Sequence, residues 1–180
     1  MTDTRDKLLD AAALVLLRDG AQALTLEAIA KQAQVSKGAL FYHFASKQAL
    51  IAGLVDRLVG QYDAALDAAG DEPGAATRAY LAATVNQATS TAANSAADRT
   101  TVALFAAALV DPAALVPLRT AYQRWQRRLE DDGIDPAVAT VVRLAVDGWW
   151  LAQLVDLAPP PPGLHERVYA TLTALIEEVR

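Results

Sequence analysis

Helix start and stop signals divide the chain into segments of helical length. The clearest are Asp111-Pro112 and Asp135-Pro136, in which a capping aspartate precedes a proline at the first helical position. Alanine, the best helix former, supplies 40 of the 180 residues, and aromatic residues make up only 6%. The pattern predicts an all-α protein of about nine helices. Their expected ranges are residues 4–18, 25–33, 36–44, 46–70, 75–91, 100–109, 112–131, 136–157 and 164–179.

The composition argues against several classes of protein. The chain has no cysteine, which excludes disulfide scaffolds, thiolate metal sites and thiol nucleophiles. No apolar run approaches the roughly 18 residues that span a bilayer, and the N-terminus lacks the apolar stretch of a signal peptide. We therefore expect a soluble, cytoplasmic protein with no membrane partner. The two histidines lie far apart and no glycine-rich phosphate loop occurs, so we expect no metal site, no cofactor and no enzymatic activity.

Charge is distributed unevenly along the chain. The formal net charge is −5 and the pI is about 4.9, an average that argues against a nucleic-acid partner. Residues 1–50, however, hold six basic and five acidic side chains, and no acid occurs from Ala28 to Val55. That window holds three of the four lysines. The acidity therefore belongs to residues 51–180, and the N-terminal segment remains a candidate for binding an anionic partner.

Residues 25–50 predict two short helices joined by a tight turn and followed by a longer helix. Thr25, Ser36 and Ser46 precede the three helices and are suited to cap them. Two short helices bury little surface alone, so their apolar side chains must pack together on the first helix of the chain. The expected core positions of this segment are Leu26, Ile29, Ala30, Val35, Leu40, Phe41 and Phe44.

The second short helix has an outward face that suits DNA. By i+3 and i+4 spacing, the side chains on this face are Ser36, Ala39, Tyr42 and His43. The start of a helix offers free backbone N–H groups to a phosphate, and Lys37 adds a positive charge there. Gly38 is small enough for the backbone to approach base edges, and Lys47 is placed for a second phosphate contact. These features together describe a helix-turn-helix.

At these residues the sequence resembles the TetR family of transcriptional repressors. The pattern T-x-E-x-I-A-x-x-A-x-V-S-x-G-x-x-Y-x-H-F-x-x-K-x-x-L is met almost throughout, with Phe41-Tyr42 standing for the family's aromatic pair. The resemblance extends over about residues 5–54. It implies an N-terminal DNA-binding domain of three helices and a larger helical domain for ligand binding and dimerisation. Such proteins typically bind palindromic operators and release them when a small molecule binds.

The resemblance also implies domain boundaries and roles for individual residues. We expect a helix-turn-helix domain over residues 1–47 and an effector-binding and dimerisation domain over residues 48–180. The residues expected to contact DNA are Thr25, Ser36, Lys37, Gly38, Ala39, Tyr42, His43 and Lys47. Gln34 stands where the family commonly has glycine. If that turn position needs a positive φ, glutamine costs about 1 kcal/mol there.

The larger domain offers candidates for a dimer interface and an effector pocket. In this family the last two helices usually form a four-helix bundle with a second copy, which implies a homodimer. The candidate interface residues are Leu151, Leu154, Val155, Val168, Leu172 and Leu175, each of which could equally be ordinary core. The candidate pocket residues, which suit a small, partly apolar effector, are Tyr80, Thr84, Gln87, Phe105, Tyr122, Trp125 and Trp150. An aromatic stripe on helices is, however, more often core.

The sequence also predicts where three further groups of side chains lie. Trp149 and Trp150 lie about 100° apart on one helix, so we expect one to face a cavity and the other the core or a dimer. His165 has no companion ligands and is expected at the surface. The basic run Arg124, Arg127 and Arg128 is expected to be a solvated face.

The sequence therefore predicts a ligand-responsive repressor that binds palindromic, double-stranded operator DNA as a homodimer and is released by an effector. Two alternatives remain open: a helical interaction or ligand-sensing protein that does not bind DNA, and a TetR-like activator. Four outward side chains argue against the first, because a mere scaffold needs none of them. They are Lys37, Tyr42, His43 and Lys47.

Overall fold

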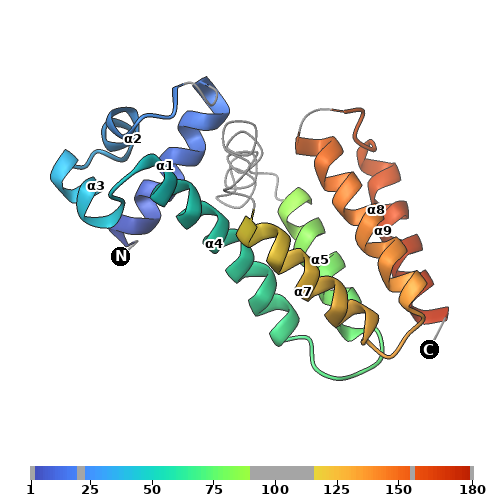
Figure 1. The fold of residues 1–180 in the computed structure, drawn as a ribbon. Helices are drawn as coiled ribbons and strands as arrows, with labels where there is room; N and C mark the ends of the chain where they lie inside the picture. Colours follow the sequence, from blue (N-terminus) through green and yellow to red (C-terminus); the bar gives the residue numbers. More distant parts are fainter. Residues whose placement is uncertain (1–2, 20–22, 90–115, 155–156, 179–180) are drawn as a thin grey trace. The chain divides into compact units, whose positions relative to one another are not determined.

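The computed structural model describes residues 3–19, 23–89, 116–154 and 157–178. These residues form eight α-helices and no strand (Figure 1), which confirms the expected all-α fold. The helix expected at residues 100–109 lies outside the described part of the chain. The described residues belong to two compact units, one built on residues 3–60 and 116–120 and the other on residues 61–89, 121–154 and 157–178. Of the described helices, none is long and apolar enough to cross a membrane.

The first unit contains α1 (Thr4–Asp19), α2 (Leu26–Ala33), α3 (Lys37–His43) and the first part of α4 (Lys47–Asp67). Its buried apolar side chains include Leu8, Leu9, Ala12, Val15, Leu16, Ile29, Ala30, Leu40, Phe44, Leu50 and Leu54. Gly53 lets α4 pack closely in this core, because a Cβ there would lie 2.8 Å from Phe44 Cε1 and 3.3 Å from Leu9 Cδ2.

Phe41 is not a core residue, contrary to the prediction. Its side chain is 52% exposed, whereas Leu40 and Phe44 are buried. The reason is the shortness of α3, whose seven residues bury only the narrow side that holds Leu40. Phe41 follows Leu40 by about 100° around the helix and therefore turns away from the core.

The three expected helix caps are confirmed. Thr25, Ser36 and Ser46 each accept, through the side-chain oxygen, a hydrogen bond of 3.1 Å from the backbone N–H three residues later. Each bond satisfies an N–H group that has no acceptor within its own helix. The short helices of this unit therefore start where the sequence places serine and threonine.

The turn between α2 and α3 requires a left-handed residue. Gln34 has φ 56° and ψ 42°, and the next backbone N–H, of Val35, donates to the Ala30 carbonyl at 3.0 Å. Glutamine at such a position costs about 1 kcal/mol relative to glycine. The departure from the family pattern is thus a small cost in stability, and the turn still forms.

The second unit contains the end of α4, α5 (Ala75–Thr89), most of α7 (Val116–Glu130), α8 (Pro136–Leu154) and α9 (Pro162–Glu178). α8 and α9 run antiparallel side by side (Figure 1). The buried side chains of this unit include Tyr62, Leu66, Tyr80, Leu81, Trp125, Leu129, Val142, Val146, Leu172 and Ile176. The Asp-Pro start of α8 is confirmed, since Asp135 Oδ1 accepts from the Ala137 N–H at 2.8 Å.

A buried carboxylate joins the α7–α8 turn to the start of α5. Asp132 Oδ1 accepts from the Ala76 N–H at 3.0 Å, and Oδ2 accepts from the Thr77 N–H at 2.8 Å and the Thr77 hydroxyl at 2.7 Å. Arg128 Nη1 lies 3.7 Å from Oδ1. The negative charge therefore sits at the N-terminus of α5, where the helix dipole favours it.

Candidate DNA-binding surface and effector groove

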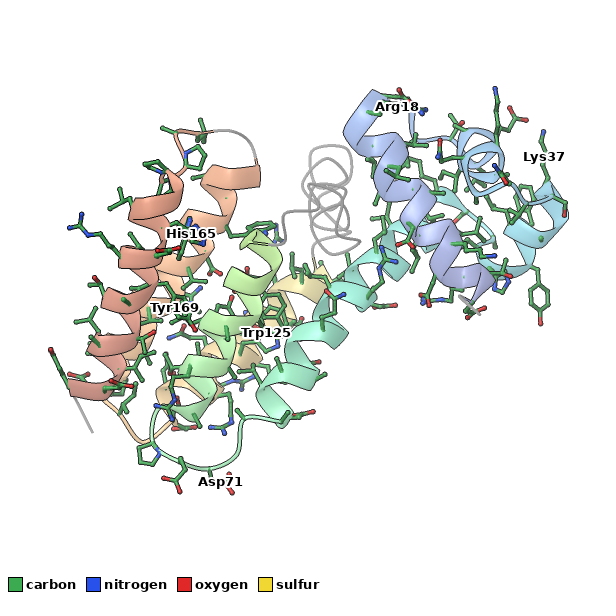
Figure 2. The ribbon with its side chains drawn as sticks, turned by 180° about the vertical axis from the view of Figure 1, so that it is seen from behind. Arg18, Lys37, Asp71, Trp125, His165 and Tyr169 are labelled. Atoms are coloured by element: carbon green, nitrogen blue, oxygen red, sulfur yellow. The ribbon has the colours of Figure 1, made fainter. Side chains whose placement is uncertain are left out.

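The outward face of α3 carries exposed side chains. Tyr42 is 86% exposed, and its ring meets that of His43 edge-on with the centroids 5.1 Å apart. Lys37 and Gly38 are also exposed, while Ala39 and His43 are half-buried. Figure 2 shows Lys37 projecting from the outer side of α3. The exposed Phe41, which sequence reasoning assigned to the core, adds a second aromatic ring to this helix.

Gly38 is not required by the fold. A Cβ built there would meet only Ser36 Oγ, at 3.9 Å, which is ordinary van der Waals distance, and its φ is not in the left-handed region. A glycine within a helix lowers stability by roughly 0.5–1 kcal/mol relative to alanine. The small residue therefore leaves the start of α3 open to a molecule outside the chain.

The lysines expected to contact DNA lie at helix starts. Lys37 is the first residue of α3 and Lys47 the first of α4. The Lys37 ammonium forms an ion pair with the Glu27 carboxylate of α2, a contact that sequence reasoning missed. The hydrogen bond from Lys37, together with its positive charge, lowers the pKa of the Glu27 carboxyl below its ordinary value.

In the second unit, four of the seven expected pocket residues form one cluster. Tyr80, Thr84 and Trp125 are buried and Tyr122 is half-buried. Ring centroids lie 5.0 Å apart for Tyr122 and Trp125 and 6.2 Å apart for Tyr80 and Trp125. Tyr62 of α4, which sequence reasoning missed, completes the cluster at 4.9 Å from Trp125 and 5.1 Å from Tyr80.

The other three expected pocket residues are Trp150, Phe105 and Gln87. Trp150 is half-buried on α8. Phe105 lies outside the described residues, and so does the side chain of Gln87. The rings of the cluster contact one another, and the Tyr62 and Thr84 hydroxyls share a hydrogen bond of 2.9 Å.

A half-buried acid lies at the edge of the aromatic cluster. Asp147 Oδ1 accepts from the Tyr80 hydroxyl at 2.8 Å and, more weakly, from the Tyr122 hydroxyl at 3.5 Å, and Arg143 Nη1 lies 3.0 Å from Oδ2. Burial raises the pKa of the Asp147 carboxyl, although the hydrogen bond from Tyr80 and the charge of Arg143 favour its ionised form. Burial also raises the pKa of Tyr122 to about 12, so this hydroxyl stays a neutral donor at physiological pH.

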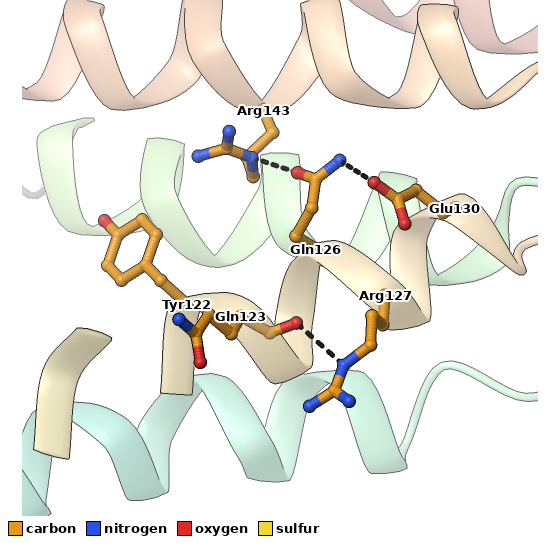
Figure 3. Close-up of a pocket in the computed structure, with 6 residues that line it drawn as sticks. All are labelled: Tyr122, Gln123, Gln126, Arg127, Glu130 and Arg143. Atoms are coloured by element: carbon orange, nitrogen blue, oxygen red, sulfur yellow. Dashed lines mark hydrogen bonds between the residues drawn. The ribbon is translucent and has the colours of Figure 1, made fainter. Parts of the chain in front are cut away.

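An open groove with a volume of about 490 Å³ lies beside the cluster (Figure 3). It is lined by Tyr122, Gln123, Gln126, Arg127, Glu130 and Arg143. Gln126 accepts from Arg143 Nε and donates to Glu130 at 2.8 Å. The volume falls within the range of small-molecule sites. Every lining side chain carries a polar group, although most of the exposed lining surface is apolar, and Tyr122 is the one expected pocket residue among those that line it.

Comparison with known families decides the identity. Residues 74–177 match the tetracyclin repressor-like C-terminal domain, and residues 8–54 match the bacterial regulatory proteins of the tetR family. The chain belongs to the TetR family of transcriptional regulators. TetR-family proteins are in general transcription factors rather than enzymes. No curated protein matches the chain.

Solved structures of similar fold cover nearly the whole TetR-family chain. A transcriptional regulator from Rhodococcus sp. Rha1 is 24% identical with a TM-score of 0.71, over 98% of this chain and 96% of that one. A TetR-family member from Streptomyces coelicolor A3 is 21% identical with a TM-score of 0.67, over 97% and 98%. The multidrug binding protein EbrR, complexed with ethidium, is 23% identical with a TM-score of 0.63, over 96% and 98%. At these identities the likeness shows the shared fold alone.

The dimer candidates on α8 and α9 of this TetR-family chain differ in exposure. Leu172 is buried within its own unit, whereas Leu151, Val168 and Leu175 are half-buried. The side chain of Leu154 and all of Val155 lie outside the described residues. The exposed apolar side chains on these two helices, which sequence reasoning did not select, are Val141, Leu144, Leu164 and Tyr169.

The structure tests two surface expectations. His165 is half-buried rather than exposed, because its ring packs edge-on against the buried Trp149 with the centroids 4.2 Å apart. In the basic run on α7, Arg124 and Arg127 are exposed, as expected of a solvated face, and Arg128 is half-buried. Arg124 pairs with Asp63 at 2.6 Å, and Trp125 Nε1 donates to the same carboxylate at 2.7 Å.

Proposed function

We propose that this TetR-family protein is a repressor that binds palindromic operator DNA as a homodimer and is released from it by a small, partly apolar effector. The observation that carries the proposal is the open start of α3. There, Ser36 caps the helix, Lys37 is exposed, and Gly38 is small without any need inside the fold. A helix start with these properties suits a phosphate and the adjacent base edges.

The proposed contacts divide into two kinds. Lys37, Lys47 and the cap Thr25 contact phosphates and set the position of the unit on the duplex. The proposed recognition residues at the start and on the outward face of α3 are Ser36, Gly38, Ala39, Tyr42 and His43. We propose that residues 1–47 provide DNA binding and that residues 48–180 provide effector binding and dimerisation.

A binding experiment tests the DNA proposal. A duplex from the upstream region of the protein's own gene should be shifted at nanomolar protein, with a strong dependence on salt. Lys47→Ala should weaken binding to all duplexes about equally, whereas Ala39→Leu should change the sequence preference. Binding that ignores both sequence and salt would refute the proposal. If neither variant alters binding, α3 is not the recognition helix.

The proposed dimer forms through α8 and α9. Support comes from Val141 and Leu144, which are more than half exposed on α8, and from the exposed Leu164 and Tyr169 on α9. A soluble protein rarely leaves several large apolar side chains exposed on neighbouring helices without a partner. Light scattering at micromolar concentration should give twice the 19.1 kDa mass of the chain. A mass of one chain would contradict the dimer, and Leu144→Glu should produce that mass.

The proposed effector site is the groove at Tyr122 together with the aromatic cluster beside it. EbrR, of similar fold, is known as a multidrug binding protein and was seen with ethidium, a planar aromatic cation. Aromatic compounds, beginning with ethidium, can be titrated onto the protein–operator complex and followed by release of the labelled duplex. A compound acting at this site should lose potency with Tyr122→Ala. Equal potency on the variant would place the effector elsewhere.

A further inference from the structure

Glu27 and Lys37 form an ion pair that connects the two short helices of the first unit. Glu27 lies in the first turn of α2 and Lys37 is the first residue of α3. Both side chains are exposed, by 74% and 66% respectively. The pair lies over a small hollow of about 100 Å³ whose other lining residues are Leu26, Leu40 and Phe41. The charge of Lys37 is therefore balanced within the protein, although its side chain is accessible from outside.

The choice of partner distinguishes Glu27 from the other paired acids of this unit. Asp19 pairs with Arg18, and Asp10 pairs with Arg57. Neither of those arginines is a proposed DNA contact. Glu27, by contrast, is bound to a lysine proposed to contact phosphate. It is also the acid that directly precedes the acid-free window from Ala28 to Val55.

We infer that Glu27 lowers the affinity of the protein for DNA by pairing with Lys37. This inference rests on the proposed function. The Glu27 carboxylate and a DNA phosphate compete for the same ammonium group. DNA binding therefore exchanges one anionic partner of Lys37 for another, instead of gaining a new charge interaction. Since an exposed ion pair is weak, the exchange occurs readily on a duplex that fits. A duplex that aligns its phosphate poorly gains nothing from the exchange.

The test compares Glu27→Gln with the wild type on two duplexes of equal length, one from the protein's own upstream region and one of shuffled sequence. Glu27→Gln frees the ammonium in both protomers of the proposed dimer. It should tighten binding about twofold to tenfold and steepen the salt dependence. The gain should be larger on the shuffled duplex. Asp19→Asn is the matched control, because it removes one acid from an exposed ion pair of the same unit without touching Lys37.

A double-mutant cycle shows whether the effect passes through Lys37. If it does, Glu27→Gln should change nothing in a Lys37→Ala background, and circular dichroism should show unchanged helix content in all variants. A gain that persists in the Lys37→Ala background would mean direct repulsion between Glu27 and DNA, which overturns the inference. No gain in either background, or an equal gain from Asp19→Asn, also overturns it. If the wild type binds neither duplex, the proposed function itself fails, and this inference with it.

Discussion

Gly38→Ala should stabilise the protein while weakening its hold on DNA. The two effects are separable because the fold accepts a larger side chain at this position, whereas the proposed contact with DNA does not. Inside the chain a Cβ at residue 38 meets only Ser36 Oγ, at 3.9 Å, so the added methyl group fits without any shift. Outside the chain, the same methyl group occupies the space that we assign to the DNA backbone and base edges.

The expected gain in stability follows from helix propensity. Replacing glycine by alanine in a compatible helical position raises the free energy of unfolding by about 0.5–1 kcal/mol, chiefly because the unfolded chain loses freedom. For a chain of this size, that raises the midpoint of thermal unfolding by about 1–4 °C. An extra methyl group forced into a close contact costs about 1–3 kcal/mol, so the operator Kd should rise about fivefold or more.

Gly60→Ala provides the matched control. Gly60 lies within α4, is exposed, and has no atom within 4 Å of a Cβ built on it. It should give a similar rise in the unfolding midpoint with no change in operator Kd. Thermal denaturation and fluorescence anisotropy with a labelled duplex measure the two quantities on the same samples. A lower midpoint for Gly38→Ala, or an operator Kd equal to that of Gly60→Ala, would refute the reasoning.

Three further predictions concern stability. Gln34→Gly should raise the free energy of unfolding by up to about 1 kcal/mol in urea titrations, because residue 34 has φ 56°. Asp132→Ala should lower it by about 3 kcal/mol, since buried donors of Ala76 and Thr77 lose their acceptor. Asp147 has a pKa raised above the ordinary 3.8, so the native state holds this proton more tightly than the unfolded chain does. Relative to Asp147→Asn, the wild type should therefore lose stability as the pH rises from below 3.8 through the raised pKa, and a flat difference would contradict this.

The sequence was most informative where structure is decided locally. A helix cap acts within three residues, so Thr25, Ser36 and Ser46 could be placed from the sequence alone. Phe41 was misplaced because periodicity fits a long helix with a wide buried face, and α3 has only seven residues. On so short a helix, the packing of the neighbouring helices decides whether a given side chain is buried or exposed.

The interactions that sequence reasoning missed are those between distant segments. Lys37 and Glu27 are ten residues apart on different helices, so no helical spacing rule connects them. Tyr62 joins the aromatic cluster from α4, and Asp147 reaches Tyr80 from α8 across 67 positions of sequence. Such contacts depend on how helices pack, which the pattern of a single helix does not reveal. A list of candidate aromatic residues can therefore be right in part and still omit the acid that organises them.

An acidic chain can bind DNA even if each of its DNA-binding units carries little net positive charge, provided that two units act together. The first 50 residues hold six basic and five acidic side chains, and the pairing of Lys37 with Glu27 reduces what one unit offers to phosphate. Because each phosphate neutralised contributes separately to binding, a single unit should bind duplexes weakly. In the proposed dimer, once the DNA-binding unit of one protomer is bound, that of its partner binds the same duplex intramolecularly. Its effective concentration there is one that a lone unit lacks. Operator half-sites have a fixed spacing of roughly 34 Å, so the proposed effector needs only to change the separation of the two α3 helices in the proposed dimer, and can leave α3 itself unaltered.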